Sequence, residues 1–234
     1  DAIQRSQQKL TTTQLQLATG KKAETYADLG TEAVRTLSAH SLLARQDAHG
    51  TVTKRLGTTL AVQDANISNI EASTETMRVE ILKAIGTGQS AGLQETIDAA
   101  FQQVRTALNA NEGGIPIFAG SRTGDRPFRP EQLADLVGRP VADAFGNDEV
   151  RASARVAEGL DIEFGVLASD LGSKVMEGFR KLAELGPIDE QVSPAQAVAL
   201  REAMTQLEDG LVEIRSINAE NGRKQAQTES LGSQ

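Results

Sequence analysis

A seven-residue repeat of mostly apolar side chains is the feature that most limits how this chain can fold. Two series between positions 56 and 84, each with a spacing of seven and offset from each other by four, carry the repeat: Leu56, Gln63, Ile70, Met77 and Ala84 in one, and Leu60, Ile67, Thr74 and Ile81 in the other. These spacings place side chains on one face of an α-helix. The repeat therefore predicts a long helix that buries one face.

The helical pattern around this repeat extends well beyond it. Apolar residues continue upstream through Val34, Leu37 and Val52, and the glycine-rich segment 86–92, GTGQSAG, ends the pattern. A continuous helix of about 55 residues would be about 80 Å long at 1.5 Å per residue. We therefore expect an elongated structure that needs a second apolar surface along its length.

A separate helix is predicted at the start of the chain. Ile3, Leu10 and Leu17 repeat every seven residues, with Gln7 and Gln14 at the intervening positions. The pattern ends at Thr19-Gly20-Lys21-Lys22, where glycine favours a helix C-terminus. Because half of its core positions are polar, this helix is weak alone, and Ile3, Leu10 and Leu17 are candidate assembly contacts with another surface.

The middle of the chain changes character. A helix predicted by Leu93, Ile97, Phe101, Val104 and Leu108 stops at 111–114. Residues 113–172 then hold four of the six prolines and four of the six phenylalanines. We expect a short strand at 115–119, and alternation on both sides of Glu158-Gly159 predicts a β-hairpin.

Helical periodicity returns after residue 172. One helix stops at Gly186-Pro187, and Ser193-Pro194-Ala195-Gln196 has the capping-box pattern of a new start. A regular apolar register then follows: Leu200, Met204, Leu207, Leu211 and Ile214. Apolar residues become rare from Glu220, so we expect the buried face to end there.

These segments predict a mainly α fold, an elongated antiparallel bundle of long N- and C-terminal helices with a small β-rich insertion. The expected divisions are an N-terminal helical segment at 1–112, a β-rich lobe at 113–172, and C-terminal helices at 173–234 that pack back on the first segment. The predicted seam joins two rows of apolar residues: Leu56, Leu60, Ile67, Ile70, Met77 and Ile81 against Leu200, Met204, Leu207, Leu211 and Ile214.

Composition excludes several classes of function. The chain of 234 residues has 24 Lys and Arg against 32 Asp and Glu, a net charge of −8, and no Cys. A nucleic-acid-binding surface needs a basic face, and a membrane-spanning helix needs about 18 or more consecutive apolar residues. The absence of Cys removes disulfides, thiolate metal sites and thiol nucleophiles. We therefore expect neither nucleic acid nor membrane among the partners.

No group of residues has the pattern of an active site. His40 and His49 are nine apart, whereas a helical metal pair is spaced by about four. Segment 86–92 follows a helix and lacks the Lys-Ser/Thr of a phosphate loop. Acidic residues at 143–148 lack the calcium-loop spacing, and Glu71 with Glu75 is typical of a solvated helix face. The sequence predicts no enzyme, no metal site and no cofactor.

Four segments, in order along the chain, resemble conserved elements of the bacterial flagellin and hook-associated (hook–filament junction) protein family. Residues 15–22, LQLATGKK, are similar to the L-S-T-G-K-R segment that ends the first helix. Residues 114–123, GIPIFAGSRT, with Pro127-Phe128, resemble the G-x-Y-x-F-G/A-G-x-x-T…P-F element. Residues 150–182 resemble the middle hairpin and return helix, and 214–223, IRSINAENGR, are close to the C-terminal R-A-x-x-G-A-R element.

The resemblance implies a structural subunit of the bacterial flagellum. The Ile-Phe-Ala-Gly segment at 117–120 favours the junction protein over a filament flagellin, which remains the alternative. The resemblance also implies flagellar type III export without a cleavable signal peptide, an export chaperone, and an extracellular location. Its partners would be further copies of itself, hook-associated protein and flagellin. A less favoured alternative is a cell-surface binding protein that presents the 113–172 lobe on a helical stalk.

The sequence departs from the family's pattern in the segment after the first element. The family usually has N-x-x-S-D-D-P-A after the first element, whereas residues 23–33 read AETYADLGTEA. The resemblance also implies terminal helices beyond this sequence and a larger insertion in many members. We therefore expect the chain alone to be monomeric or weakly associated.

Overall fold

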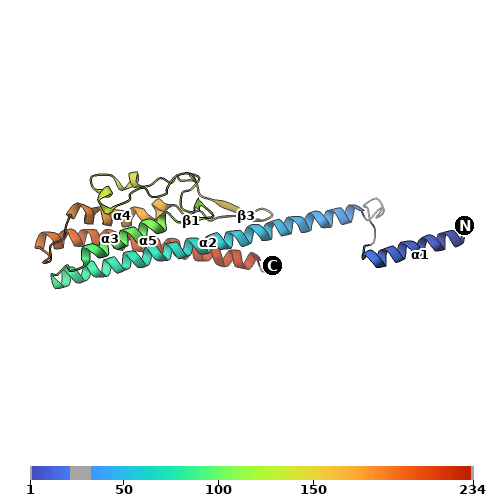
Figure 1. The fold of residues 1–234 in the computed structure, drawn as a ribbon, viewed down its shortest axis with the longest axis horizontal. Coiled ribbons are helices and arrows are strands. Elements are labelled where there is room, and N and C mark those ends of the chain that lie inside the picture. The colour runs from blue at the N-terminus through green and yellow to red at the C-terminus, as the bar shows by residue number, and fades with distance from the viewer. Residues whose placement is uncertain (1, 22–32, 233–234) are drawn as a thin grey trace. The chain divides into compact units, whose positions relative to one another are not determined.

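The computed structural model describes residues 2–21 and 33–232, and they are mainly α-helical. The described residues form five α-helices: α1 (Ala2–Thr19), α2 (Ala33–Thr87), α3 (Leu93–Leu108), α4 (Ala168–Leu185) and α5 (Pro194–Gly232) (Figure 1). Between α3 and α4 lie short strands and two 3-10 turns, η2 (Leu133–Leu136) and η3 (Val141–Ala144). The predicted fold class, mainly α with a small β-rich insertion, is confirmed.

The chain divides into two compact units, residues 1–49 and 50–234. The first contains α1 and α2 as far as His49, and the second contains the rest of α2 and everything after it. The boundaries predicted after residues 112 and 172 both fall inside the second unit, and the predicted division into three segments stays a prediction.

Helix α2 confirms the long helix predicted from the repeat, and it runs for 55 residues. Within the second unit, every residue of both seven-residue series is buried, including the polar Gln63 and Thr74. After α2, the glycine-rich segment is fixed by main-chain hydrogen bonds to the turn between α4 and α5. Ser90 N donates to Glu190 O over 3.1 Å, and Val192 N donates to Gly88 O over 3.0 Å.

Helix α5 begins with the predicted capping box. Ser193 N donates to Gln196 Oε1 over 3.1 Å, and Gln196 N donates to Ser193 Oγ over 3.2 Å. The expectation that the buried face ends at Glu220 was wrong, because α5 continues to Gly232 and buries Asn221 and Thr228. The low hydropathy of this stretch does not predict that burial. The buried side chains are polar and donate hydrogen bonds, Asn221 to Leu60 O of α2 and Thr228 to Lys224 O within α5.

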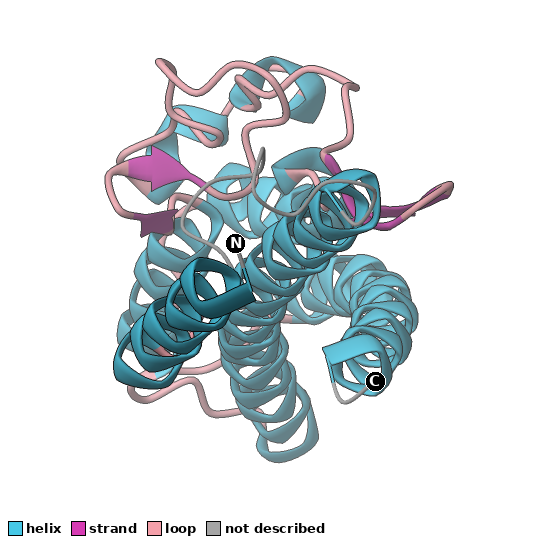
Figure 2. Cartoon of the chain, turned by 90° about the vertical axis from the view of Figure 1, so that its right-hand side faces the viewer, coloured by secondary structure: helices cyan, strands magenta, loops and turns pink. Residues whose placement is uncertain are grey.

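Helices α3 and α4 complete the helical layer of the second unit, and the lobe lies on one side of it (Figures 1 and 2). Glycines with positive φ precede α3 and follow α4: Gly92 at 77° and Gly186 at 72°. The main core joins α2, α3, α4 and α5 to the lobe residues Phe118, Phe128 and Phe145. The lobe therefore shares this core with the helices.

The first strand pair is shorter than predicted. Strands β1 (Asn111–Glu112) and β2 (Ile115–Pro116) pair through a turn whose two glycines, Gly113 and Gly114, have φ of 59° and 85°. The predicted strand at 115–119 therefore ends at Pro116, since the chain then turns inward to bury Phe118. Thr59 Oγ1 of α2 donates to the Glu112 carboxylate over 2.8 Å, which ties this turn to the helix.

The predicted β-hairpin is confirmed as strands β3 (Ser153–Ala157) and β4 (Leu160–Glu163). The turn residue Gly159 has φ of 73°. Arg155 and Asp161 face each other across the strands, with two hydrogen bonds of 2.8 Å between guanidinium and carboxylate. On the buried side, Val156 and Ile162 pack in a second apolar cluster with Leu56 and Leu60 of α2.

Candidate assembly surfaces

Helices α2 and α5 pack against each other and form the α2–α5 frame, which supports the candidate surfaces of the second unit. Ion pairs show that the two helices are antiparallel: Glu71 pairs with Arg215 at 2.7 Å, and farther along α2, Arg78 pairs with Glu208 at 3.4 Å. Figure 1 shows α5 lying along α2 in this way. The Arg78 guanidinium, by its hydrogen bond and charge, lowers the pKa of Glu75 below the ordinary value. Glu71 and Glu75 thus join the helix pairing, a role that the sequence did not indicate.

The structure places all eleven predicted seam residues in the interior, ten of them buried and Met204 half-buried. One core brings together Ile67, Ile70, Met77 and Ile81 of α2 with Leu200, Leu207 and Ile214 of α5, and Met204 packs against it. It does not bring Leu56 and Leu60 to this row, because they pack with the hairpin and Leu231. The predicted row is therefore divided between two apolar clusters, and Leu211, although buried, belongs to neither of them.

A polar layer lies between those clusters. Asn221 of α5 donates its side-chain Nδ2 to the main-chain oxygen of Leu60 over 3.0 Å, across 161 positions of sequence. Gln63, Asn218 and Asn221 each hold a buried amide oxygen that has no hydrogen-bond donor in the described structure. Buried amides in a helix seam fix its register at a cost in stability. This layer is therefore suited to specifying one alignment of α2 and α5.

Helices α4 and α5 approach each other more closely than large side chains would allow. A Cβ atom at Gly178 would lie 2.6 Å from Leu207 Cδ2. Two ion pairs flank this contact, Lys181 with Glu202 at 3.1 Å and Lys174 with Glu213 at 3.7 Å. The sequence does not indicate this role of Gly178, since a glycine inside a helix ordinarily indicates only lower helix propensity.

A chain of aromatic rings attaches the lobe to the helices. Phe101 of α3 lies edge to face against Phe179 of α4 and Phe128 of the lobe, at centroid distances of 5.5 and 6.1 Å. Phe128 continues to Phe145 at 5.4 Å. Such ring pairs contribute about 0.5–1.5 kcal/mol each beyond the area they bury. Phe128 and Phe145 of the lobe are therefore core residues.

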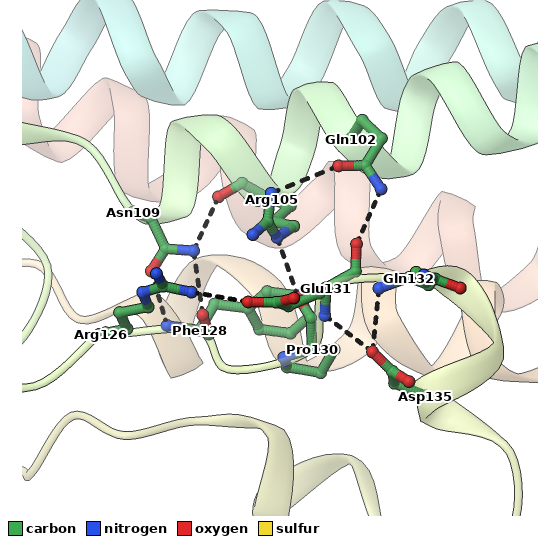
Figure 3. Close-up of polar contacts among 9 residues, drawn as sticks. All are labelled: Gln102, Arg105, Asn109, Arg126, Phe128, Pro130, Glu131, Gln132 and Asp135. Carbon is green, nitrogen blue, oxygen red and sulfur yellow. Dashed lines mark hydrogen bonds and ion pairs between the residues drawn. The ribbon is translucent and has the colours of Figure 1, made fainter.

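Side chains of α3 and of Asn109, the residue that follows it, hold the main chain of the same lobe segment, as Figure 3 shows. Asn109 accepts from Phe128 N over 3.0 Å and donates to Phe128 O over 2.9 Å. Arg105 Nε donates to Pro130 O over 3.0 Å, and Gln102 Nε2 donates to Glu131 O over 2.9 Å. These three side chains thus fix three residues of the loop, at positions 128, 130 and 131.

The acidic stretch at 143–148 has a structural role through Asp148. Its carboxylate accepts hydrogen bonds from the Ser121 hydroxyl, from Ser121 N at 2.9 Å and from Val150 N at 3.1 Å. These bonds, those of Ser121 foremost, hold the pKa of Asp148 below its usual value. Gly120 is required beside it, because a Cβ there would lie 2.1 Å from Asp148 Oδ1 and φ is +66°.

The first unit has several apolar side chains that are exposed to solvent. Helix α1 buries none of its residues, and Ile3, Leu10 and Leu17 are 76%, 63% and 79% exposed. Val34 and Leu37 at the start of α2 are also exposed. A row of exposed apolar side chains marks a surface suited to contact with another chain. Whether the three α1 residues make assembly contacts remains a prediction.

The metal sites and membrane-spanning helices considered from the sequence have no counterpart among the described residues. Within residues 2–21 and 33–232, no group of three or more His, Asp or Glu residues is arranged to hold a metal ion. His40 is exposed and His49 half-buried in α2. Among the described helices, none combines the length and apolar character needed to cross a membrane. Tyr26 and most of the divergent 23–33 segment lie outside the described residues.

Comparison with known proteins identifies the fold. No protein-family model and no curated protein sequence matches the chain. A Vibrio parahaemolyticus protein assigned to the flagellar hook-associated proteins matches with a TM-score of 0.73 and 16% identity, over 89% of this chain and 93% of its own. FlgL of Bacillus cereus matches with a TM-score of 0.68 and 16% identity, over 86% of this chain and 94% of its own. The chain therefore has the fold of flagellar hook-associated proteins.

Proposed function

We propose that this chain is a structural subunit of the bacterial flagellum and that it acts as a hook–filament junction protein. The observation that carries the proposal is the match of nearly the whole chain to two solved structures, one of a flagellar hook-associated protein and one of FlgL, a hook–filament junction protein. The four sequence elements that resemble this family, found in the expected order, support it independently of the fold.

The proposed mechanism is subunit packing and not catalysis. The α2–α5 frame and the lobe fixed to α3 form one body whose core is shared. Ile3, Leu10 and Leu17 of α1 would contact neighbouring subunits, because they are exposed here and burial of such side chains contributes roughly 1.5–3 kcal/mol each. Neighbours would be further copies of the chain and other flagellar axial proteins, namely hook-associated protein and flagellin.

The remaining parts of the proposal follow from the same resemblance. We expect the protein to lie outside the cell in the flagellum, after type III export without a cleavable signal peptide and with the help of an export chaperone. We expect no nucleic-acid or membrane partner, in keeping with the net charge of −8.

Filament flagellin remains the alternative within the same class, and the Ile-Phe-Ala-Gly segment at 117–120 favours the junction protein. A surface protein that binds sugars through the lobe is disfavoured by the packing of its aromatic residues. Phe118, Phe128 and Phe145 are buried and so unavailable for stacking on a sugar, and Phe164 is half-buried.

The proposal is tested by adding the purified chain to hooks isolated from cells that lack its gene. We expect immunogold label at the distal hook ends in electron micrographs. A variant with Ile3→Asp, Leu10→Asp and Leu17→Asp, shown by circular dichroism to be folded, should not bind. Unlabelled hook ends contradict the junction role, and self-assembly into long filaments indicates flagellin instead.

A further inference from the structure

A polar pocket of about 330 Å³ lies between strand β4, the start of α4 and one face of α5. Four carboxylates line it, those of Glu163, Asp170, Glu213 and Glu220, against the two cationic side chains of Arg151 and Lys224. A volume of this size is about ten times the share of one water molecule in the liquid. The pocket therefore has room for a polar group larger than water.

The carboxylates exceed the cations that this chain supplies to the pocket. Arg151 pairs with Asp170 at 2.8 Å, and Lys224 pairs with Glu220 at 2.7 Å. Glu213 reaches only Lys174, which lies outside the pocket lining, at 3.7 Å. Within the described part of the chain, Glu163 has no ion-pair partner within 4.0 Å. Among the four, the Glu163 carboxylate thus has no ion pair in the described chain, and that of Glu213 has a single long one, so an incoming positive charge can bind between them.

A second observation also indicates a missing donor. Asn221 lines the pocket and is 2% exposed, and its side-chain oxygen has no hydrogen-bond donor in the described structure. Its Nδ2 group is already committed to Leu60 O, so the amide is held in one orientation. Buried polar atoms are ordinarily hydrogen-bonded. The wall therefore combines excess negative charge with an unpartnered acceptor.

We propose that this pocket binds a guanidinium group, the side chain of an arginine from a neighbouring subunit. A guanidinium has five N–H donors, no acceptor and a planar fork that matches carboxylates. A metal ion fits less well, because no group of three or more His, Asp or Glu residues in the described chain is arranged to hold one. The inference rests on the proposed function for the source of the arginine, a second subunit in an assembly.

The arginine that we assign to the pocket is Arg5 of a second copy. Residues 2–21 contain Arg5, Lys9 and Lys21 and no acidic residue, whereas the whole chain has a net charge of −8. Arg5 is exposed on α1, a helix that buries none of its residues. An acid-free helix and a pocket with excess carboxylates are complementary in charge, which favours their association and sets its orientation.

The test measures binding of a synthetic peptide of residues 2–21 to the full chain by isothermal titration calorimetry. We expect saturable binding that weakens as NaCl is raised. The double variant Glu163→Gln/Glu213→Gln should bind the peptide at least about tenfold more weakly, because it removes the charge from two hydrogen-bond acceptors. A matched double variant, Glu80→Gln/Glu95→Gln, removes the same charge elsewhere and should bind as the original chain does. Equal melting temperatures of the variants establish that they are folded.

Peptide variants separate the guanidinium from charge alone. An Arg5→Lys peptide keeps the charge but loses the fork, and should bind several-fold more weakly than the original. The inference is overturned by an absence of peptide binding, by equal binding of the Arg5→Gln peptide, or by equal losses in the two double variants. Hook-end labelling tests the proposed function separately, so unlabelled hooks alongside specific peptide binding would contradict that function and leave the pocket assignment standing.

Discussion

Gly210 of α5 lies directly against Val175 of α4. A Cβ atom at position 210 would be 2.6 Å from Val175 Cγ2 and 3.0 Å from the Val175 main-chain nitrogen. Gly178 of α4 has the reciprocal relation to Leu207 of α5. Because one of the nearest atoms at Gly210 belongs to the main chain, a side chain there would push the helices apart.

We expect Gly210→Ala to lower the free energy of unfolding by about 1–3 kcal/mol through overpacking. This loss should appear although alanine favours a helix over glycine by about 1 kcal/mol. Gly222→Ala on the same helix is the control, since a Cβ there meets nothing within 4 Å, and it should stabilise slightly. Urea denaturation measures both, and equal effects at the two positions would contradict the close contact.

Leu207 tests the predicted seam itself. Its side chain is fully buried in the main core, so Leu207→Ala should cost about 2–5 kcal/mol and Leu207→Asp more. Val212→Asp is the matched control, because Val212 is on the same helix and exposed. A melting temperature of Leu207→Asp equal to that of the unmodified chain would refute the seam.

The repeat in α2 allowed much of the fold to be predicted. A spacing of seven fits only one face of a helix, so the burial of Ile67, Ile70 and Met77 follows from the sequence. Partner choice does not follow in the same way. Leu56 and Leu60 pack against the hairpin. This contact joins segments that are far apart in the sequence and depends on how the lobe folds back on α2, so the repeat does not predict it.

Hydropathy also failed to predict which polar residues are buried. Asn221 and Thr228 carry no apolar signal, yet both are buried in α5. The burial of Asn221 depends on the Leu60 carbonyl, a partner 161 positions away that periodicity cannot indicate. The close approach at Gly178 and Gly210 was missed for a related reason, since a helical glycine carries no sign of what lies opposite it.

Asn109→Ala should loosen the lobe without unfolding the helices. The variant loses both hydrogen bonds to the Phe128 main chain, and we expect about 1–3 kcal/mol of destabilisation. The amide of Phe128 should exchange faster with deuterium. Asn66→Ala is the control, because Asn66 donates only within its own helix, to Val62 O. Unchanged exchange at Phe128 in Asn109→Ala would contradict the proposed clamp.

Acid should weaken the attachment of the turn at Ser121. Hydrogen bonds to Asp148, chiefly from Ser121, lower its pKa in the folded state. The stability it contributes is therefore present above the ordinary aspartate pKa of about 3.9 and is lost as pH falls through the lower folded value. Asp148→Asn should lower the melting temperature at pH 7, and the difference from the unmodified chain should shrink near pH 2. Asp125→Asn serves as the exposed control, and a pH-independent difference would contradict this account.

The most direct test of the central proposal is electron microscopy of cells from which the gene for this chain has been deleted. The junction role predicts complete hooks without filaments, with flagellin monomers in the medium and filaments restored by the unmodified gene. Normal filaments on the deleted cells would contradict that role, whatever the fold of the chain.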